Sequence, residues 1–136
     1  MSERATMPPP AVAPAAWQSC SGRFPGRPDQ VGEARAFVAR FLHGHTAADE
    51  AILLVSELCA NAVAHSASGR PGGTFTVRAE IEGPVVRAEV EDQGSGWDGN
   101  LRAAQCPHGL FLLRQFSAAC GAVPRGPGWL IWFTLA

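Results

Sequence analysis

Between Pro28 and Gly44 the apolar residues recur every three or four positions, which is the spacing of one helix face. The residues that follow this pattern are Ala34, Phe37, Val38 and Phe41. Pro28 is tolerated in the first turn of a helix, and Asp29 favours a helix N-terminus through its negative charge. The pattern therefore predicts a helix from Pro28 to about Leu42, ended by Gly44.

A second helical segment begins at Thr46, whose spacing to Asp49 resembles a capping box with Asp in the place of Glu. It should end near Ser66, before the sequence Gly-Arg-Pro-Gly-Gly. One side of this helix is apolar and carries Leu58, Cys59, Ala62 and Val63. Glu57 and Asn61 point to the opposite side, and because they are four residues apart they stack one turn from each other.

Alternating apolar and polar residues predict strands elsewhere in the chain. Two runs, 75–81 and 86–91, alternate at every step and are joined by a Glu-Gly-Pro turn typical of a hairpin. An edge strand is expected at 17–24 and a third helix from about Gly109. The apolar run 129–135 suits a strand covered on both faces. Together these elements predict an α/β (α+β) two-layer sandwich, with helices on one face of a mixed, mainly antiparallel sheet.

Composition and charge narrow the class of protein. The 136 residues suit one domain, which we expect at 17–136, whereas the Ala- and Pro-rich segment 1–16 is expected to be a flexible tail. A net charge of −1 argues against binding nucleic acid or an anionic membrane through bulk electrostatics. No apolar run approaches the length of a membrane span, and no secretory signal opens the chain. We therefore expect a cytoplasmic protein with reduced cysteines.

The Glu57 and Asn61 pair has a chemical interpretation and a structural one. A glutamate one turn from an amide oxygen can act as a base beside a ligand for Mg²⁺. The alternative is a solvated polar helix face. His43 and His45 could suggest a different metal site, but no third ligand is placed near them, so metal binding is not expected there.

A carboxylate also falls at an inward position of the predicted sheet. Extending the alternation of the run 86–91 by one step puts Asp92 on the inner face, where an unpaired charge is costly. Gly94 and Gly96 follow, and their lack of side chains lets the backbone approach a ligand closely. Such an acid can accept a hydrogen bond from an exocyclic amine such as that of adenine, although a tight turn explains D-x-G-x-G about as well. Downstream, Gly109 and Leu110 open a helix whose N-terminus offers N–H groups to a phosphate.

The order of these three motifs resembles the GHKL ATP-binding superfamily, of the gyrase, Hsp90, histidine-kinase and MutL type. Its pattern is E-x-x-x-N on a helix, D-x-G-x-G after a strand and G-L opening another helix. The short chain and the wording of 54–65, Leu-Val-Ser-Glu-Leu-Cys-Ala-Asn-Ala-Val-Ala-His, are similar to the anti-sigma-factor serine/threonine kinases of Gram-positive bacteria. The resemblance covers nearly everything from Trp17 to Leu135 and implies the Bergerat ATP-binding fold.

The resemblance implies a role for each motif residue. Asn61 coordinates the Mg²⁺ that bridges the ATP phosphates, Glu57 is the general base toward a substrate serine or threonine, and Asp92 binds the adenine amino group. The other residues implied around ATP, at the pocket floor and at the start of the phosphate-facing helix, are Gly94, Gly96, Gly109 and Leu110. The implied partner is a STAS-type anti-sigma-factor antagonist, and a sigma factor and a second copy of the chain are further candidates.

Three features depart from the family pattern. Pro107 stands where the family has the first glycine of G-x-G-L, and proline removes one N–H donor. Only twelve residues separate Gly96 from Gly109, which is short for a segment that folds over the nucleotide. The chain has no lysine, so a phosphate would need an arginine such as Arg102 or Arg114.

These departures leave a second hypothesis open, in which the chain holds nucleotide poorly or not at all and acts by sequestering a partner. The catalytic domain of a two-component histidine kinase is disfavoured, because no preceding helical segment carries a phospho-acceptor histidine.

Overall fold

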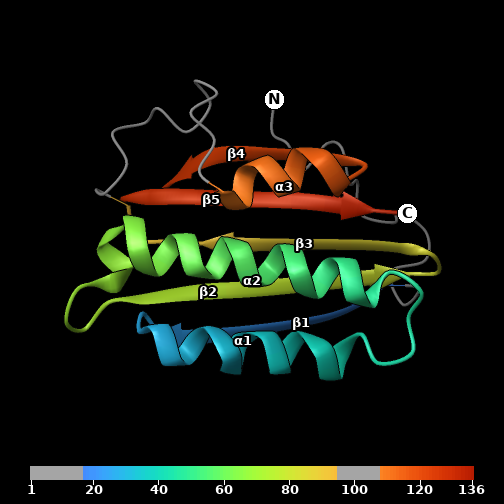
Figure 1. Ribbon diagram of the computed structural model, residues 1–136, viewed down its shortest axis with the longest axis horizontal. Helices are drawn as coiled ribbons and strands as arrows, with labels where there is room; N and C mark the ends of the chain where they lie inside the picture. Colours follow the sequence, from blue (N-terminus) through green and yellow to red (C-terminus); the bar gives the residue numbers. More distant parts are fainter. Residues whose placement is uncertain (1–16, 95–107) are drawn as a thin grey trace.

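The computed structural model describes residues 17–94 and 108–136, which contain all the helices and strands named below. Five strands form one sheet, in the order β1-β2-β3-β5-β4 (Figure 1). The strands are β1 (Gln18–Pro25), β2 (Thr74–Glu82), β3 (Val85–Glu91), β4 (Ala119–Arg125) and β5 (Gly128–Leu135). The helices are α1 (Pro28–Phe41), α2 (Ala48–His65), the short 3₁₀ helix η3 (Ala67–Gly69) and α3 (His108–Phe116).

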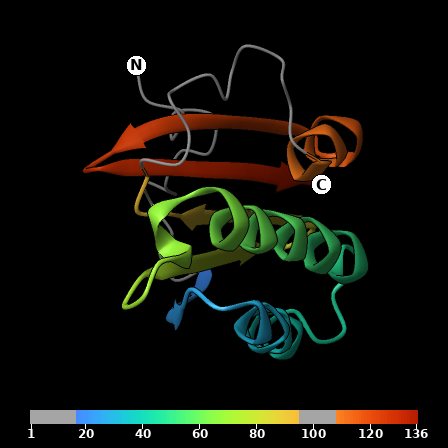
Figure 2. The same cartoon turned by 60° about the vertical axis from the view of Figure 1, so that its left-hand side comes forward.

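The three α-helices pack on one face of this sheet, as Figures 1 and 2 show from two directions. Ala79 of β2 is paired with Ala88 of β3, which is paired in turn with Phe133 of β5, so their side chains form one row under the helices. The helices cover this row with fully buried apolar side chains, among them Ala34, Val38, Leu54, Val55 and Leu58. The core between the two layers therefore comes from the residues whose spacing predicted the elements.

This architecture confirms the predicted two-layer α/β fold. All four strand pairs of the described sheet are antiparallel, so the parallel pairing that a mixed sheet requires does not occur among them. None of the described helices has the length and apolar character needed to cross a membrane.

Strand β4 is an element that the sequence pattern did not predict. Gly121 and Pro124 interrupt its alternation, and both residues disfavour strands. The sheet explains the glycine, because Gly121 is paired with Trp132 and a Cβ at Gly121 would lie 2.8 Å from the indole Nε1 of Trp132. Pro124 lies near the end of an edge strand, where a missing N–H is tolerated. Pairing with β5 therefore outweighs the local preference.

The N-terminus of α2 differs from the predicted capping box. The N-cap residue is Ala47, not Thr46, and the alanine side chain cannot accept a hydrogen bond from the first turn of the helix. Instead, Nδ1 of His45 accepts the backbone N–H of Ala47 at 3.0 Å. Because Nδ1 is an acceptor, the ring proton sits on Nε2, which donates to the carbonyl oxygen of Gly83 at 2.8 Å. His45 thus joins the start of α2 to the β2–β3 hairpin, and the capping-box prediction was wrong.

Candidate nucleotide site

Helix α2 carries the predicted site residues Glu57 and Asn61, but Asn61 belongs to its buried residues. The prediction that both side chains point away from the apolar side was therefore wrong for Asn61, because the buried side of the helix also includes Leu54 and is wider than predicted. Glu57 is partly exposed and makes no hydrogen bond or ion pair to the described residues. Asn61, one turn later, is only 8% exposed, so the rest of the domain covers most of its side chain. The predicted one-turn spacing of the two residues is therefore realised within α2.

The amide of Asn61 is the clearest sign of an incomplete site. Its Nδ2 is buried and has no hydrogen-bond partner among the described residues. A buried polar atom without a partner costs roughly 1–3 kcal/mol, so such atoms are rare in folded proteins. The unpartnered nitrogen is a donor that a ligand could satisfy, and the oxygen of the same amide is a suitable ligand for Mg²⁺.

Asp92 lies directly after β3 and is held by the backbone. Its Oδ1 accepts the N–H of Gly94 at 2.8 Å and the N–H of Trp129 at 3.1 Å. The residue is 6% exposed, as the inward position predicted from the strand alternation requires. Both of these bonds use the same carboxylate oxygen, so neither occupies Oδ2.

Burial raises the pKa of the Asp92 carboxyl above its ordinary value, because water no longer solvates the charged form. The N–H groups of Trp129 and Gly94 act in the opposite direction, since they stabilise the ionised oxygen that accepts them. The negative charge of Glu91 adds a smaller upward contribution. Asp92 is thus an acceptor whose protonation begins at a higher pH than that of an exposed aspartate.

Two glycines allow the close approach of the Asp92 loop to β5. Gly94 has a φ of +77°, and a Cβ there would overlap the carbonyl oxygen of Pro127. A Cβ at Gly128 would overlap the backbone oxygen of Asp92 and lie 2.7 Å from its Oδ1. The sequence predicted that Gly94 shapes a pocket floor. In the structure, a glycine is needed there because the backbone of residue 94 lies against the carbonyl oxygen of Pro127. The sequence analysis did not predict a role for Gly128. The feature that could have indicated one is a glycine at the start of a strand of otherwise large residues.

The loop that carries Asp92 is also tied to the end of α2. The N–H of Gln93 donates to Oγ of Ser68 at 3.0 Å, and the N–H of Ala67 donates to the carbonyl oxygen of Gly94. Ser68 is itself fully buried in η3, which follows α2. These bonds join the helix of Asn61 to the loop of Asp92, so the two predicted motifs belong to one connected unit. Nothing in the local sequence pattern indicated this role of Ser68.

The third motif is described only in part. Helix α3 begins at His108, so Gly109 and Leu110 lie in its first turn, as the predicted start at about Gly109 requires. Gly96, Arg102 and Pro107 fall outside the described residues. Arg114 is in the last turn of α3, away from the helix N-terminus that would face a phosphate.

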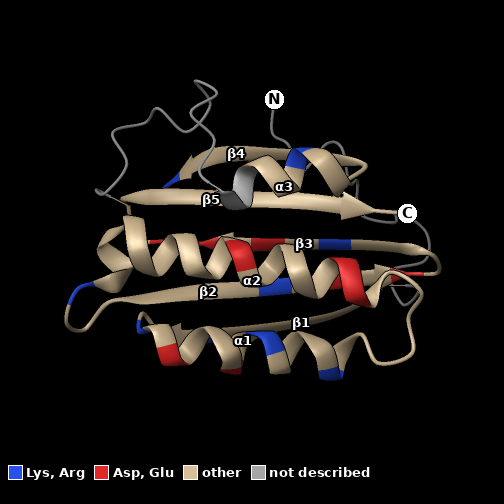
Figure 3. Ribbon diagram, in the orientation of Figure 1, with Lys and Arg blue, Asp and Glu red and all other residues tan. Residues whose placement is uncertain are grey.

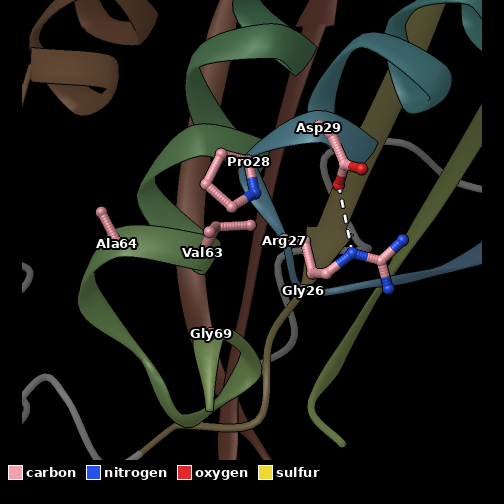
Figure 4. Close-up of a pocket in the computed structure, with 7 residues that line it drawn as sticks. All are labelled: Gly26, Arg27, Pro28, Asp29, Val63, Ala64 and Gly69. Atoms are coloured by element: carbon pink, nitrogen blue, oxygen red, sulfur yellow. Dashed lines mark hydrogen bonds and ion pairs between the residues drawn. The ribbon is translucent and has the colours of Figure 1, made fainter. Parts of the chain in front are cut away.

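A separate open pocket of about 650 Å³ lies between the start of α1 and the end of α2 (Figure 4). Pro28, Val63 and Ala64 give it apolar walls, and Nε of Arg27 contacts Oδ1 of Asp29 at 3.2 Å beside it. None of the predicted site residues that the structure describes lines this pocket. The pocket is therefore separate from the residues that the sequence predicted to bind nucleotide.

The described residues include no cluster of three or more histidine, cysteine or acidic side chains that could bind a metal by themselves. Both nitrogens of His45 are engaged in hydrogen bonds, to the carbonyl oxygen of Gly83 and to the N–H of Ala47. One amide oxygen at Asn61 instead suits a Mg²⁺ ion whose other ligands are phosphate oxygens and water. The residues present thus fit Mg²⁺ with a nucleotide.

The described residues thus place an inward carboxylate, a buried amide nitrogen without a partner and a glutamate one turn from that amide on an α/β two-layer fold. The family model of the histidine kinase-like ATPase domain matches residues 24–134, and the chain belongs to that family. Membership supports the GHKL resemblance and implies ATP binding. No curated protein matches the chain.

Proposed function

We propose that the protein is an anti-sigma factor that uses Mg²⁺ and ATP to phosphorylate a serine or threonine of a STAS-type anti-sigma-factor antagonist. The observation that carries this proposal is the buried, unpartnered amide of Asn61, one turn from Glu57 and in the same connected unit as Asp92. A cytoplasmic location follows from the proposal, because sigma factors act on the bacterial transcription machinery.

Each residue has one task in this scheme. Oδ2 of Asp92 accepts a hydrogen bond from the adenine amino group, while Oδ1 stays bound to the backbone N–H groups of Gly94 and Trp129. The side-chain oxygen of Asn61 would hold Mg²⁺, and the ion would supply positive charge that neutralises phosphate charge. The hydroxyl oxygen of the substrate serine or threonine bonds to the γ-phosphorus of ATP, and the bond between this phosphorus and the ADP oxygen breaks. The carboxylate of Glu57 takes the proton that the hydroxyl loses.

The test of this function uses ATP labelled at the γ-phosphate and a purified STAS-domain antagonist from the same genome. Transfer of label to the antagonist by the unaltered chain, and its loss in Glu57→Gln, is the expected result. Nucleotide binding without any transfer to antagonists would instead support the second candidate.

That second candidate is a partner-sequestering module on the same fold. It is favoured by Pro107 in the place of a phosphate-binding glycine and by the absence of lysine from the chain. In this case the antagonist or a sigma factor binds the domain, as monomer or homodimer, without being phosphorylated. The affinity for the partner would then be the same in Glu57→Gln as in the unaltered chain.

A further inference from the structure

Trp129 lies opposite Asp92 on the neighbouring strand, and its side chain is on the same face of the sheet. The register pairs Glu91 with Leu130, so one further step places Asp92 opposite Trp129. The backbone N–H of Asp92 donates to the carbonyl oxygen of Trp129 at 2.9 Å, which continues the pairing to this position. Side chains opposite each other in an antiparallel pair project to one face, with Cβ atoms roughly 5 Å apart. The indole of Trp129 therefore adjoins the carboxylate proposed to bind adenine.

The packing of Trp129 agrees with this face. Its side chain packs against the core cluster between the sheet and the helices, which contains Ile131 and Phe133 of the same strand. Leu130 and Trp132, which alternate with them, are buried but do not belong to that cluster. Trp129 is thus on the helix-covered face, toward which Asp92 also points.

Trp129 is less covered than the other residues on this face of β5. Ile131, Phe133 and Leu135 are at most 4% exposed, whereas Trp129 is only partly buried. Aromatic side chains stabilise a fold mainly by removing their large apolar surface from water. An inward tryptophan that keeps part of this surface accessible, beside a carboxylate with one unoccupied oxygen, leaves an aromatic face for a ligand.

No basic side chain lies on the strand of Trp129 or on the helix of Asn61. Figure 3 shows β5 and α2 without lysine or arginine. These elements therefore suit the uncharged base of a nucleotide better than its phosphates. A base can stack its flat face on an aromatic ring while its exocyclic amine donates to an acceptor. Trp129 and Asp92 supply these two contacts, and Gly128 adds no side chain between them.

We infer that the indole of Trp129 stacks on the purine ring of the nucleotide whose amino group donates to Oδ2 of Asp92. Asp92 recognises the edge of the base and Trp129 binds its face. The inference rests on the nucleotide site of the proposed function and adds a base-binding residue to it. It does not depend on phosphoryl transfer.

The first test is the tryptophan fluorescence of the full chain during titration with ATP and Mg²⁺. A purine that stacks on an indole quenches its emission, so we expect a saturable decrease that is lost in Trp129→Phe. Trp132→Phe, on the other face of the sheet, is the matched control and should retain the decrease. A decrease of the same size in Trp129→Phe would overturn the inference.

The second test compares affinities by calorimetry. Trp129→Leu keeps an apolar side chain against the core but removes the aromatic face, so the affinity for ATP should fall at least about fivefold. Trp129→Phe retains an aromatic ring and should bind more tightly than Trp129→Leu. The affinity for tripolyphosphate with Mg²⁺ should be the same in Trp129→Leu as in the unaltered chain, because this ligand has no base.

Equal affinities for ATP in Trp129→Leu and the unaltered chain would overturn the inference and leave the nucleotide site intact. Tighter binding by Trp129→Leu would also overturn it, because the indole would then occupy the place of the base. An equal loss of affinity for ATP and tripolyphosphate would make Trp129 structural. If Trp129→Leu does not fold, the fluorescence of Trp129→Phe decides.

Failure of the proposed function gives different results. Base-dependent ATP binding without phosphoryl transfer would contradict the kinase proposal and support the inference. The absence of ATP binding by the unaltered chain would overturn the nucleotide site and the inference together.

Discussion

Asp92 and Trp129 hold each other through two hydrogen bonds. The backbone N–H of Asp92 donates to the carbonyl oxygen of Trp129 at 2.9 Å, and the N–H of Trp129 donates to Oδ1 of Asp92 at 3.1 Å. The first bond extends the ladder between β3 and β5, and the second fixes the carboxylate. The acceptor proposed for adenine is thus in place before a ligand binds, which lowers the ordering cost of binding.

Asn61→Leu should separate stability from binding. Leucine has the same branched shape and the same number of side-chain heavy atoms as asparagine and removes the buried unpaired amide nitrogen, so the free energy of unfolding should rise by about 1 kcal/mol without nucleotide. Stabilisation by Mg²⁺ and ATP should disappear. Urea denaturation with and without nucleotide measures both effects, and Ser56→Ala on the same helix is the control. A loss of stability in Asn61→Leu would mean that the amide is structural.

The affinity for ATP should fall as the pH is lowered through the raised pKa of Asp92, because a protonated carboxyl presents an O–H to the adenine amine. Binding measured by calorimetry at a series of pH values from neutrality downward checks this for the unaltered chain. Asp92→Asn has no such titration and serves as the control. An affinity that rises on acidification in the unaltered chain alone would contradict the assignment.

The same raised pKa has the opposite effect on folding. A carboxyl whose pKa is higher in the folded state contributes stability that is complete below its unfolded pKa and is lost as the pH rises through the folded pKa. Relative to Asp92→Asn, the unaltered chain should therefore lose free energy of unfolding as the pH rises through this range. Parallel stability curves for the two proteins would show that burial does not perturb Asp92.

Much of the fold could be predicted because the deciding signals are local. The 3.6-residue spacing of apolar residues predicted α1 and α2, and the strict alternation of β3 predicted the inward position of Asp92. The remaining features depend on contacts between distant positions. Strand β4 exists through its pairing with β5, Ser68 matters because it accepts the N–H of Gln93, and Gly128 matters because Asp92 lies against it. The spacing of apolar and polar residues along the chain does not indicate contacts between positions far apart in the sequence.

The start of α2 offers a test of the unexpected cap. His45→Ala should lower the free energy of unfolding by about 1 kcal/mol, since it removes the acceptor for the Ala47 N–H and the bond to Gly83. Thr46→Ala should change it by less than about 0.5 kcal/mol, because Thr46 is exposed and does not cap the helix. The free energies of unfolding of the two variants are compared by thermal or urea denaturation. A larger loss for Thr46→Ala than for His45→Ala would support the capping box and contradict the cap by His45.

Glu57→Gln should leave nucleotide binding within about twofold and reduce phosphoryl transfer by about 100-fold or more, because glutamine cannot accept the substrate proton. Single-turnover transfer to the antagonist, measured together with ATP affinity, separates the two quantities. Glu50→Gln, an exposed acid two turns earlier on α2, is the matched control and should change neither. Equal transfer rates for the unaltered chain and Glu57→Gln would remove Glu57 as the base.

The central claim is that Asn61 and Asp92 form a Mg²⁺-dependent ATP site, and calorimetric titration of the purified chain with ATP tests it most directly. We predict saturable heat that requires Mg²⁺ and an affinity lower by roughly tenfold or more in Asp92→Asn, which loses an acceptor that hydrogen-bonds a ligand. Unaltered secondary structure in the variant would exclude misfolding as the cause. The absence of binding by the unaltered chain up to millimolar ATP would contradict the account.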